Sequence, residues 1–413
     1  MELRPGYKQT EVGVIPEDWD VSPLGRLVTS VEYGSSAKSS TKGSMPVLRM
    51  GNLQGGKIDW SDLVYTSDES EIAKYALRPG DVLFNRTNTI DLVGKTSIYR
   101  GEQPAIFAGY LIRINAKKEF LDSRFLNYTL NTELAKKYSS KVLSVAVGQA
   151  NINGQKLKTY PIPLPPTTAE QSAIAEALSD VDALLSGLDK LIAKKRNLKQ
   201  AAMQQLLTGK TRLPGFAGAW EVTKIGRFTD CTAGGTPSTL IAGYWGGNIR
   251  WMNSGELNLR RVYEVEGRIT TAGLNNSSTK LIPSGCVLIG LAGQGRTRGT
   301  VAMNYVELCT NQSIAAIFPN PSFSSEYLYQ NLDSRYEELR ELSSGGGGRG
   351  GLNLTLIKGL EIPFPSVEEQ TAIAEVLSDM DAELAALEAR REKTRLLKQG
   401  MMQELLTGKT RLV

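Results

Sequence analysis

Two long stretches of the chain place apolar residues at a helical spacing among polar ones. Each stretch covers about 40 residues, or roughly 60 Å at the 1.5 Å rise of an α-helix. The apolar side chains of the first stretch lie largely at a spacing of three and then four residues: Ile174, Ala177, Val181, Leu184, Leu188, Leu191 and Leu198. The second stretch repeats this spacing at Ile373, Val376, Met380, Leu387, Leu397 and Met401. The pattern predicts two amphipathic helices, each with one apolar stripe.

Both predicted helices have recognisable ends. Thr167 with Glu170, and Ser366 with Glu369, have the spacing of a capping box, whose side chains bond to free N–H groups of the first turn. After the last apolar positions come glycines and then basic residues, as is typical of helix C-termini. We therefore expect the helices to end near Gly209 and Gly408.

The two stretches are copies of each other. "EQSAIAEALSD" at Glu170 returns as "EQTAIAEVLSD" at Glu369, and "LLTGKTRL" at Leu206 returns unchanged at Leu405. Gly-Lys-Thr also ends phosphate-binding loops, but such a loop needs an earlier glycine and a preceding strand. Glutamine stands at that position in both copies and a helix precedes it, which disfavours nucleotide binding. The spacing of about 199 residues instead indicates duplication of half the molecule.

A helix with a single apolar stripe cannot bury that stripe alone, and its own copy is the natural partner. The alternative is that each helix packs on its neighbouring domain, and the spacing does not decide between parallel and antiparallel pairing. The residues we expect to pair the helices are Ile174, Val181, Leu184, Leu188, Leu191, Ile373, Met380 and Leu387.

The rest of the chain forms two less similar parts, which we call the first head (1–160) and the second head (214–361). They open alike, with "WDVSPLGRLV" at Trp19 and "WEVTKIGRFT" at Trp220, and then diverge. Short β-type runs separated by Gly, Asn, Ser and Thr predict mixed, strand-rich domains. The expected fold is α+β, with the helices in segments 161–213 and 362–413. The segment before Trp19 resembles the one after the first helix, so we expect it beside the C-terminal helix.

Composition removes several classes of chemistry. The chain has no histidine, which excludes histidine-based triads and the commonest general base. Three scattered cysteines are too few for a disulfide framework or a zinc cluster. A net charge of +5 allows a polyanionic partner. No stretch approaches the roughly 20 apolar residues of a membrane helix or the pattern of a signal peptide, so we expect a cytoplasmic protein.

The loops of both heads are rich in side chains that address base edges and phosphates in DNA. The alternatives are solvated surface charges for the Arg and Lys residues, a flexible linker for "SSGGGGRGG" at Ser343, and core positions for Trp245 and Trp251. The candidate DNA contacts are Arg49, Asn52, Arg86, Asn88, Lys95, Gln149, Asn151, Arg250, Asn253, Gln294, Arg296, Arg298 and Arg349.

The duplicated helix ending in "LLTGKTRL" and the paired "W-[DE]-V" openings resemble the specificity subunit of type I restriction-modification systems, over essentially the whole chain. The resemblance implies two target-recognition domains separated by an antiparallel pair of long helices. Each domain would read one half of a split, asymmetric site on double-stranded DNA. It also implies two methyltransferase subunits and motor-nuclease restriction subunits as partners, docked around a pseudo-twofold repeat.

Catalysis is expected to lie on those partners. The chain lacks the Asn-Pro-Pro-aromatic loop of an adenine methyltransferase, a Gly-rich cofactor turn and a complete Walker motif. S-adenosylmethionine, ATP and Mg are therefore expected on partner subunits, with no cofactor or metal on this chain. Two other classes stay open: a stand-alone DNA-binding regulator or coiled-coil scaffold, and an enzyme with an unrecognised active site.

Overall fold

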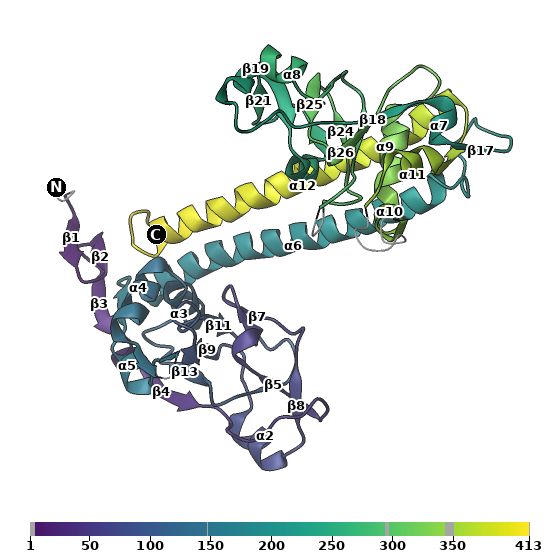
Figure 1. Cartoon of the computed structure of the whole chain (residues 1–413). Coiled ribbons are helices and arrows are strands. Elements are labelled where there is room, and N and C mark those ends of the chain that lie inside the picture. The colour runs from purple at the N-terminus through teal and green to yellow at the C-terminus, as the bar shows by residue number, and fades with distance from the viewer. Residues whose placement is uncertain (1–4, 147, 294–296, 343–350, 413) are drawn as a thin grey trace. The chain divides into compact units, whose positions relative to one another are not determined.

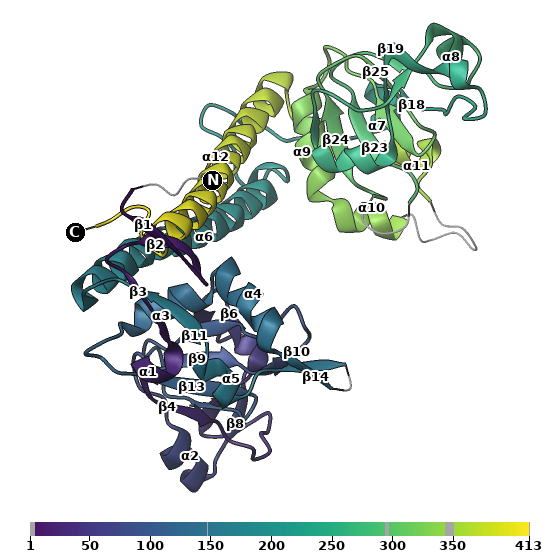
Figure 2. The same ribbon diagram turned by 90° about the vertical axis from the view of Figure 1, so that its left-hand side faces the viewer.

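The computed structural model describes residues 5–146, 148–293, 297–342 and 351–412. The chain divides into two compact units (Figures 1 and 2). Unit 1 is Met1–Asp189 with Ala389–Val413, and unit 2 is Lys190–Glu388. Each unit therefore holds one head together with half of each long helix, a grouping that does not follow chain order.

The two predicted long helices are confirmed as α6 (Thr168–Leu206) and α12 (Val367–Leu405). The Thr167 hydroxyl accepts a hydrogen bond from the Glu170 N–H at 3.2 Å, and the Ser366 hydroxyl accepts one from the Glu369 N–H at 3.3 Å. Beyond the helices, Gly209 and Gly408 have φ angles of 70° and 69°, the left-handed conformation that ends a helix at low cost in glycine.

Within each unit the two helices run antiparallel (Figure 1). In unit 1, Asp182 and Asp189 of α6 pair with Lys398 and Arg391 of α12 at 2.9 and 3.3 Å, so later positions of one helix meet earlier positions of the other. The same order holds in unit 2, where Lys195 pairs with Glu383 at 2.6 Å and Lys199 with Asp381 at 2.5 Å.

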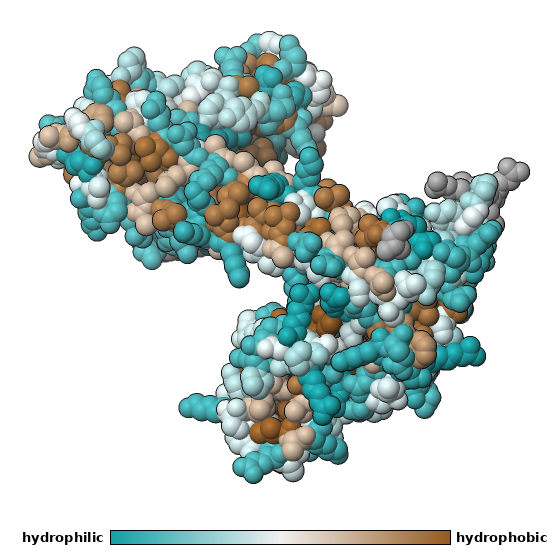
Figure 3. All heavy atoms as spheres, turned by 180° about the vertical axis from the view of Figure 1, so that it is seen from behind, coloured by the Kyte–Doolittle hydropathy of each residue, from teal (hydrophilic) through white to brown (hydrophobic). Residues whose placement is uncertain are grey.

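Five positions of the predicted apolar stripes are exposed, among them Leu198, Val376 and Leu397, which are 46%, 36% and 59% exposed. Ile174, Leu188 and Ile373 are buried as expected, while Val181, Met380 and Leu387 are half-buried. Leu184 and Leu191, however, are 43% and 38% exposed, and Ile192 is buried instead. Consecutive apolar residues fit the periodicity equally well, so the sequence does not decide which one faces inward. On the face of the molecule drawn in Figure 3, apolar patches lie among hydrophilic ones.

The first head is built around a four-stranded antiparallel sheet in the order β11-β9-β13-β4, beside three-stranded sheets β12-β5-β8 and β10-β15-β14. Central strand β9 has all four residues buried. The strands of unit 1 are β1 (Tyr7–Thr10), β2 (Gly13–Pro16), β3 (Asp20–Pro23), β4 (Val28–Tyr33), β5 (Met45–Leu48), β6 (Leu53–Gln54), β7 (Lys57–Ile58), β8 (Val64–Thr66), β9 (Val82–Asn85), β10 (Thr87–Asn88), β11 (Thr96–Ile98), β12 (Ile106–Phe107), β13 (Leu111–Ala116), β14 (Ser144–Ala146), β15 (Gln149–Asn151) and β16 (Pro161–Leu164).

A shared hydrophobic core joins the first head to the two long helices. This core packs Trp19, Phe84 and Phe125 against Ile174 and Leu178 of α6 and Leu405 of α12. The short helices of unit 1 are α1 (Leu24–Leu27), η1 (Met50–Asn52), α2 (Glu69–Tyr75), α3 (Ser123–Leu130), α4 (Glu133–Val142) and α5 (Gly154–Lys158).

The second head repeats this plan with different residues. Strand β23 takes the place of β9 at the centre of the sheet β18-β26-β23-β24-β20, and a second sheet has the order β21-β19-β25-β22. The strands of unit 2 are β17 (Glu221–Lys224), β18 (Cys231–Ala233), β19 (Trp245–Met252), β20 (Arg261–Val262), β21 (Arg268–Ile269), β22 (Leu281–Ile282), β23 (Val287–Gly290), β24 (Val301–Asn304), β25 (Leu308–Thr310), β26 (Ile314–Ile317) and β27 (Glu361–Phe364). Its short helices are α7 (Ile225–Phe228), η2 (Ala242–Tyr244), η3 (Ser254–Leu259), α8 (Thr271–Asn275), α9 (Ser325–Ser334), α10 (Tyr336–Leu342) and α11 (Leu354–Gly359).

Candidate nucleic-acid interface

Four of the predicted DNA contacts come together on one small sheet of the first head. Strand β10 pairs with β15, which sets Thr87 opposite Asn151 and Asn88 opposite Ala150. Arg86 precedes β10, and Gln149 begins β15 with an exposed side chain. The pairing brings these residues to one small sheet, although more than 50 residues separate the two pairs in the sequence. They do not share one face: Gln149 and Asn151 lie on the face of Thr87, and Asn88 lies on the opposite one, because side chains alternate along a strand.

Arg86 is held against an aromatic ring. Its guanidinium carbon lies 4.8 Å from the centre of the Tyr33 ring, and its Nη1 donates to the Gly109 carbonyl at 3.3 Å. Tyr33 and the neighbouring Tyr110 are 43% and 55% exposed. Arginine and tyrosine side chains on an exposed surface are suited to contacts with phosphates and bases.

Three other candidates of the first head have partners within the domain. Asn52 is 2% exposed, and its amide donates to the carbonyls of Asp59 and Asp62 at 2.9 and 3.2 Å. Arg49 forms an ion pair with Asp62 at 3.0 Å, and Lys95 donates to the Gln54 side chain at 3.1 Å. In the free protein, Asn52 thus supports its own turn, while Arg49 and Lys95 already have a polar partner each.

In the second head, Arg250 lies in β19 and pairs with Glu264 at 3.1 Å. Hydrogen bonds from Arg250 and from the Val265 N–H, with the charges of Arg250 and Arg268, lower the pKa of Glu264 to about 2. Asn253 caps η3 by accepting the Gly255 N–H at 2.8 Å. Arg298 is half-buried. The remaining candidates Gln294, Arg296 and Arg349 lie outside the described residues.

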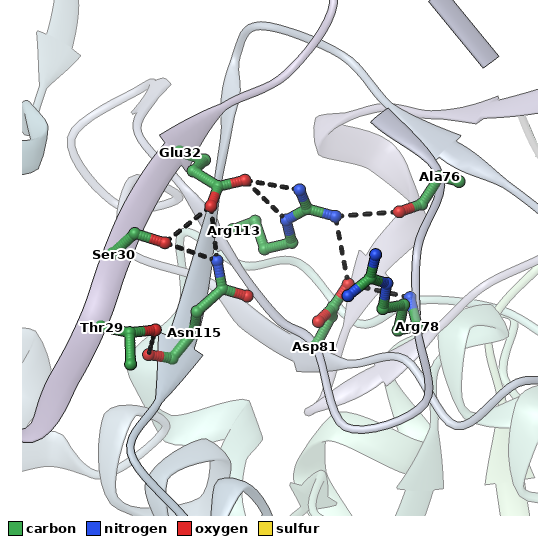
Figure 4. Close-up of polar contacts among 8 residues, drawn as sticks. All are labelled: Thr29, Ser30, Glu32, Ala76, Arg78, Asp81, Arg113 and Asn115. Atoms are coloured by element: carbon green, nitrogen blue, oxygen red, sulfur yellow. Dashed lines mark hydrogen bonds and ion pairs between the residues drawn. The ribbon is translucent and has the colours of Figure 1, made fainter. Parts of the chain in front are cut away.

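One face of the first head's main sheet carries a charged cluster around Arg113 of β13 (Figure 4). Its guanidinium contacts Glu32 of β4 and Asp81, and donates to the Ala76 carbonyl at 2.9 Å. Burial raises the pKa of Asp81 above its ordinary value. Burial alone would also raise the pKa of Glu32, but hydrogen bonds from Ser30 and Arg113 hold it below its ordinary value. The cluster ties three segments of the head together.

Sequence reasoning missed one loop in each head. In the first head residues 34–44 join β4 to β5, and in the second head residues 234–244 join β18 to β19. These loops are topological equivalents, since β4 and β18 flank corresponding sheets and β5 and β19 each pair in parallel, with β12 and β25. A signal was present: no acidic residue occurs between Glu32 and Asp59, or between Asp230 and Glu256. Segments without acidic residues can approach a polyanion without repulsion.

The repeated "TGKTRL" motif has a structural role in both units. In unit 2, Arg212 pairs with the buried Glu369 at the start of α12 at 2.5 Å, and the Trp220 indole donates to the same carboxylate at 3.0 Å. In unit 1, Arg411 donates to the buried Glu170 at 2.8 Å and to Asp18 at 3.0 Å. Each motif thus fastens the end of one long helix to the start of the other.

The N-terminal segment lies beside the end of α12, as its resemblance to the segment after α6 predicts. Arg411 bonds to Asp18 as described, and the Tyr7 hydroxyl donates to the Gly408 carbonyl at 3.4 Å. In the described part of the chain, no helix is long and apolar enough to cross a membrane. Among those residues there is also no group of three or more His, Cys, Asp or Glu side chains placed to hold a metal ion.

Paired recognition heads on a duplicated helical scaffold define a class of DNA specificity proteins, and comparison with known proteins identifies the family. The chain matches the type I restriction modification DNA specificity domain twice, at residues 16–197 and 218–397. It therefore belongs to this family, and it is a non-catalytic DNA specificity subunit of a type I restriction-modification system.

Named relatives agree with this assignment. A Methanocaldococcus jannaschii protein that carries the name of the type I restriction enzyme MjaX specificity subunit is 28% identical over 98% of this chain and 97% of its own length. The Escherichia coli EcoR124I/EcoR124II specificity subunit is 27% identical over 56% of this chain and 57% of its own.

The same fold occurs in solved structures. The type I restriction-modification S subunit from M. genitalium superposes with a TM-score of 0.63 at 15% identity, covering 98% of both chains. A chain from a study of complex assembly and conformational transition in the type I restriction-modification system gives a TM-score of 0.57 at 17% identity, over 96% of this chain and 99% of that one.

Proposed function

We propose that each head reads one half of a split, asymmetric site on double-stranded DNA. The observation that carries this is a difference between equivalent positions: the scaffold residues of the two units are nearly the same, whereas the loops 34–44 and 234–244 differ. The first is "GSSAKSSTKGS", with two lysines, and the second is "GGTPSTLIAGY", with no charge. Because different side chains prefer different bases, two such heads favour two different half-sites.

The map of adenine methylation in the host genome tests this function. With the gene intact, we expect one split motif whose two halves differ, and we expect that motif to vanish when the gene is deleted. Exchanging residues 1–160 for the first head of another specificity subunit should change one half of the motif only. A motif that persists after deletion, while the neighbouring methyltransferase is expressed, would contradict the proposal and favour a stand-alone regulator.

We propose two equivalent grooves as docking sites for two methyltransferase subunits. The groove of unit 1 has a cavity volume of about 510 Å³ and that of unit 2 about 620 Å³. The end of each long helix and the turn after it contribute residues of the same type and order: Gln399, Met402, Gln403, Leu406 and Thr407 in unit 1, and Gln200, Met203, Gln204, Leu207 and Thr208 in unit 2. The residues that the two grooves have in common suit two copies of one partner.

The head residues that complete the grooves are not the same: Glu133 and Lys136 line one, Arg335 and Glu338 the other. The helix residues are thus the common part that one type of partner can use twice. Motor-nuclease subunits would join through this assembly. S-adenosylmethionine would bind to the methyltransferase, and ATP and Mg to the motor-nuclease subunits, because this chain carries no motif for them.

The groove proposal predicts a change in stoichiometry. Gln204 and Gln403 are exposed, so tryptophan at either position should fill one groove without disturbing the core. Native mass spectrometry should show two methyltransferase copies with the natural chain, one with Gln204→Trp or Gln403→Trp, and none with both. Lys194→Trp, on the exposed face of α6 outside the groove, is the matched control. Two copies retained in the double variant would contradict the assignment.

A further inference from the structure

The loop 234–244 of the second head carries an unusually exposed apolar residue. Leu240 is 94% exposed, whereas the next most exposed large apolar side chain among the described residues, Val222, is 65% exposed. The adjacent Ile241 is 44% exposed. Single exposed leucines are common on protein surfaces, so exposure alone does not indicate a role. Leu240 differs from other exposed leucines because hydrogen bonds hold the backbone of its loop in place.

Two tryptophan side chains fix the loop from below. The Trp251 indole donates to the Gly235 carbonyl at 3.0 Å, and the Trp245 indole donates to the Ser238 carbonyl at 3.1 Å. The two rings pack edge to face, with centroids 5.0 Å apart. An indole has a single hydrogen-bond donor, and in both tryptophans this N–H donates to the backbone of the loop. These two hydrogen bonds hold the loop in one conformation.

The base and the tip of the loop are constrained as well. A Cβ atom on Gly234 would lie 2.1 Å from the Thr310 carbonyl oxygen, so the backbone passes too close there for any other residue. At the tip, the Ile241 N–H donates to the Ser238 carbonyl at 3.3 Å, which closes a tight turn around Leu240. The result is a rigid turn that presents one leucine to solvent.

The chemistry around Leu240 suits contact with DNA. Thr236, Ser238 and Thr239 supply hydroxyl groups, and the acid-free segment between Asp230 and Glu256 offers no carboxylate to repel phosphates. The equivalent loop of the first head has no large apolar residue and carries Lys38 and Lys42 among serines and threonines, a composition that favours phosphate contacts. Equivalent loops thus offer a cation in one head and an apolar tip in the other.

We propose that Leu240 is an apolar wedge that the second head inserts between two stacked base pairs of its half-site. Proteins that kink DNA use leucine and similar side chains in this way, and the cost of unstacking depends on the base step. The wedge therefore makes the second head sensitive to DNA deformability at one step, in addition to its direct base contacts. The first head reads its half-site without a wedge. This inference rests on the proposed DNA-recognition function.

The test uses the complete complex with its methyltransferase and a duplex of the motif found by the methylation map. 2-Aminopurine is placed in turn at each position of the half-site assigned to the second head, because its fluorescence rises when a base loses its stacking partners. We expect the natural chain to raise the signal on both sides of one step, and Leu240→Ala to abolish that rise. Leu240→Phe, which keeps a large apolar tip, should retain it.

Affinity provides the second readout. Losing the burial of one leucine should weaken binding about tenfold with Leu240→Ala. Leu259→Ala, at a 53% exposed leucine at the end of η3 in the same head, should leave affinity unchanged. Because Leu240 is so exposed, Leu240→Ala should also keep the thermal midpoint of the natural chain.

Each other outcome overturns the wedge. A base flipped by the methyltransferase gives a signal that survives Leu240→Ala, and if this is the only signal, no wedge exists. Weaker methyltransferase association with unchanged DNA stacking would make Leu240 a protein contact instead. Specific binding without any Leu240-dependent signal removes only the wedge, whereas the absence of any sequence preference removes the proposed function as well.

Discussion

Replacing Glu369 by alanine should lower the stability of unit 2 by about 3 kcal/mol, because breaking a buried ion pair by removing one partner is strongly destabilising. Glu369 is 1% exposed. Its carboxylate forms an ion pair with Arg212 at 2.5 Å and accepts a hydrogen bond from the Trp220 indole at 3.0 Å. The substitution leaves both donors without their acceptor at the point where the end of α6 meets the start of α12.

Thermal unfolding of the whole chain measures this effect. For a unit of this size, such a loss corresponds to a fall in the midpoint of roughly 6–12 °C. Glu368→Ala is the matched control, because Glu368 is the adjacent acidic residue in the same first turn and its side chain is exposed. Equal midpoints for the two variants would show that the repeated motif does not fasten the helices through this carboxylate.

Replacing Asp182 by alanine should destabilise unit 1 by a similar amount, about 3 kcal/mol, since it leaves a partly buried lysine uncompensated. Asp182 is 6% exposed and stands where three segments meet. Its carboxylate forms an ion pair with Lys398 of α12 at 2.9 Å and accepts a hydrogen bond from the Tyr128 hydroxyl of α3 at 2.8 Å. Lys57 of the first head lies 3.5 Å away. The side chain therefore joins helix to helix and head to helix.

A double variant distinguishes pairing from a general disturbance of the helix. Asp182→Leu with Lys398→Met should recover most of the lost stability, because an apolar pair of similar volume often replaces a buried ion pair without cost. Asp180→Ala, at an exposed position two residues earlier, is the control for the single variant. If the double variant loses as much free energy of unfolding as the two single variants lose together, the ion pair is not the source of the effect.

Unit 2 repeats this junction with a different head residue. Asp381, the counterpart of Asp182, pairs with Lys199 at 2.5 Å, and the Gln330 side chain donates to it at 3.0 Å. The acidic residue and the lysine are part of the duplicated helix, whereas tyrosine in one head is replaced by glutamine in the other. A common helix junction thus accepts heads with different sequences, which suits a protein whose two recognition domains have diverged.

Much of the scaffold could be predicted from the chain alone. The caps at Thr167 and Ser366 and the glycines after each helix are local signals, because hydrogen bonds within a few residues determine where a helix begins and ends. The glutamate half of each predicted capping box was wrong, since Glu170 bonds to Arg411 and Glu369 to Arg212. Family membership followed from the repeated motif, whose length makes a chance match improbable.

The interface was less accessible to sequence reasoning. Arg86 and Asn151 come to the same small sheet only because β10 pairs with β15, and such a pairing depends on the closure of long loops that leaves no local pattern. Asn52 looked like a DNA contact by residue type, but its amide is satisfied by the Asp59 and Asp62 carbonyls within its own turn. Residue type alone does not separate a ligand contact from a support of the backbone.

The sequence by itself therefore determined the duplicated helices, their ends, the two divergent heads and the absence of histidine-based catalysis, all of which rest on local spacing and composition. Tertiary structure decided that Leu184 faces solvent, that Arg212 reaches Glu369, and that two indoles hold the backbone of the loop that carries Leu240. These features join segments far apart in the chain. Their free energy comes from burial and from hydrogen bonds that exist only after the chain has folded.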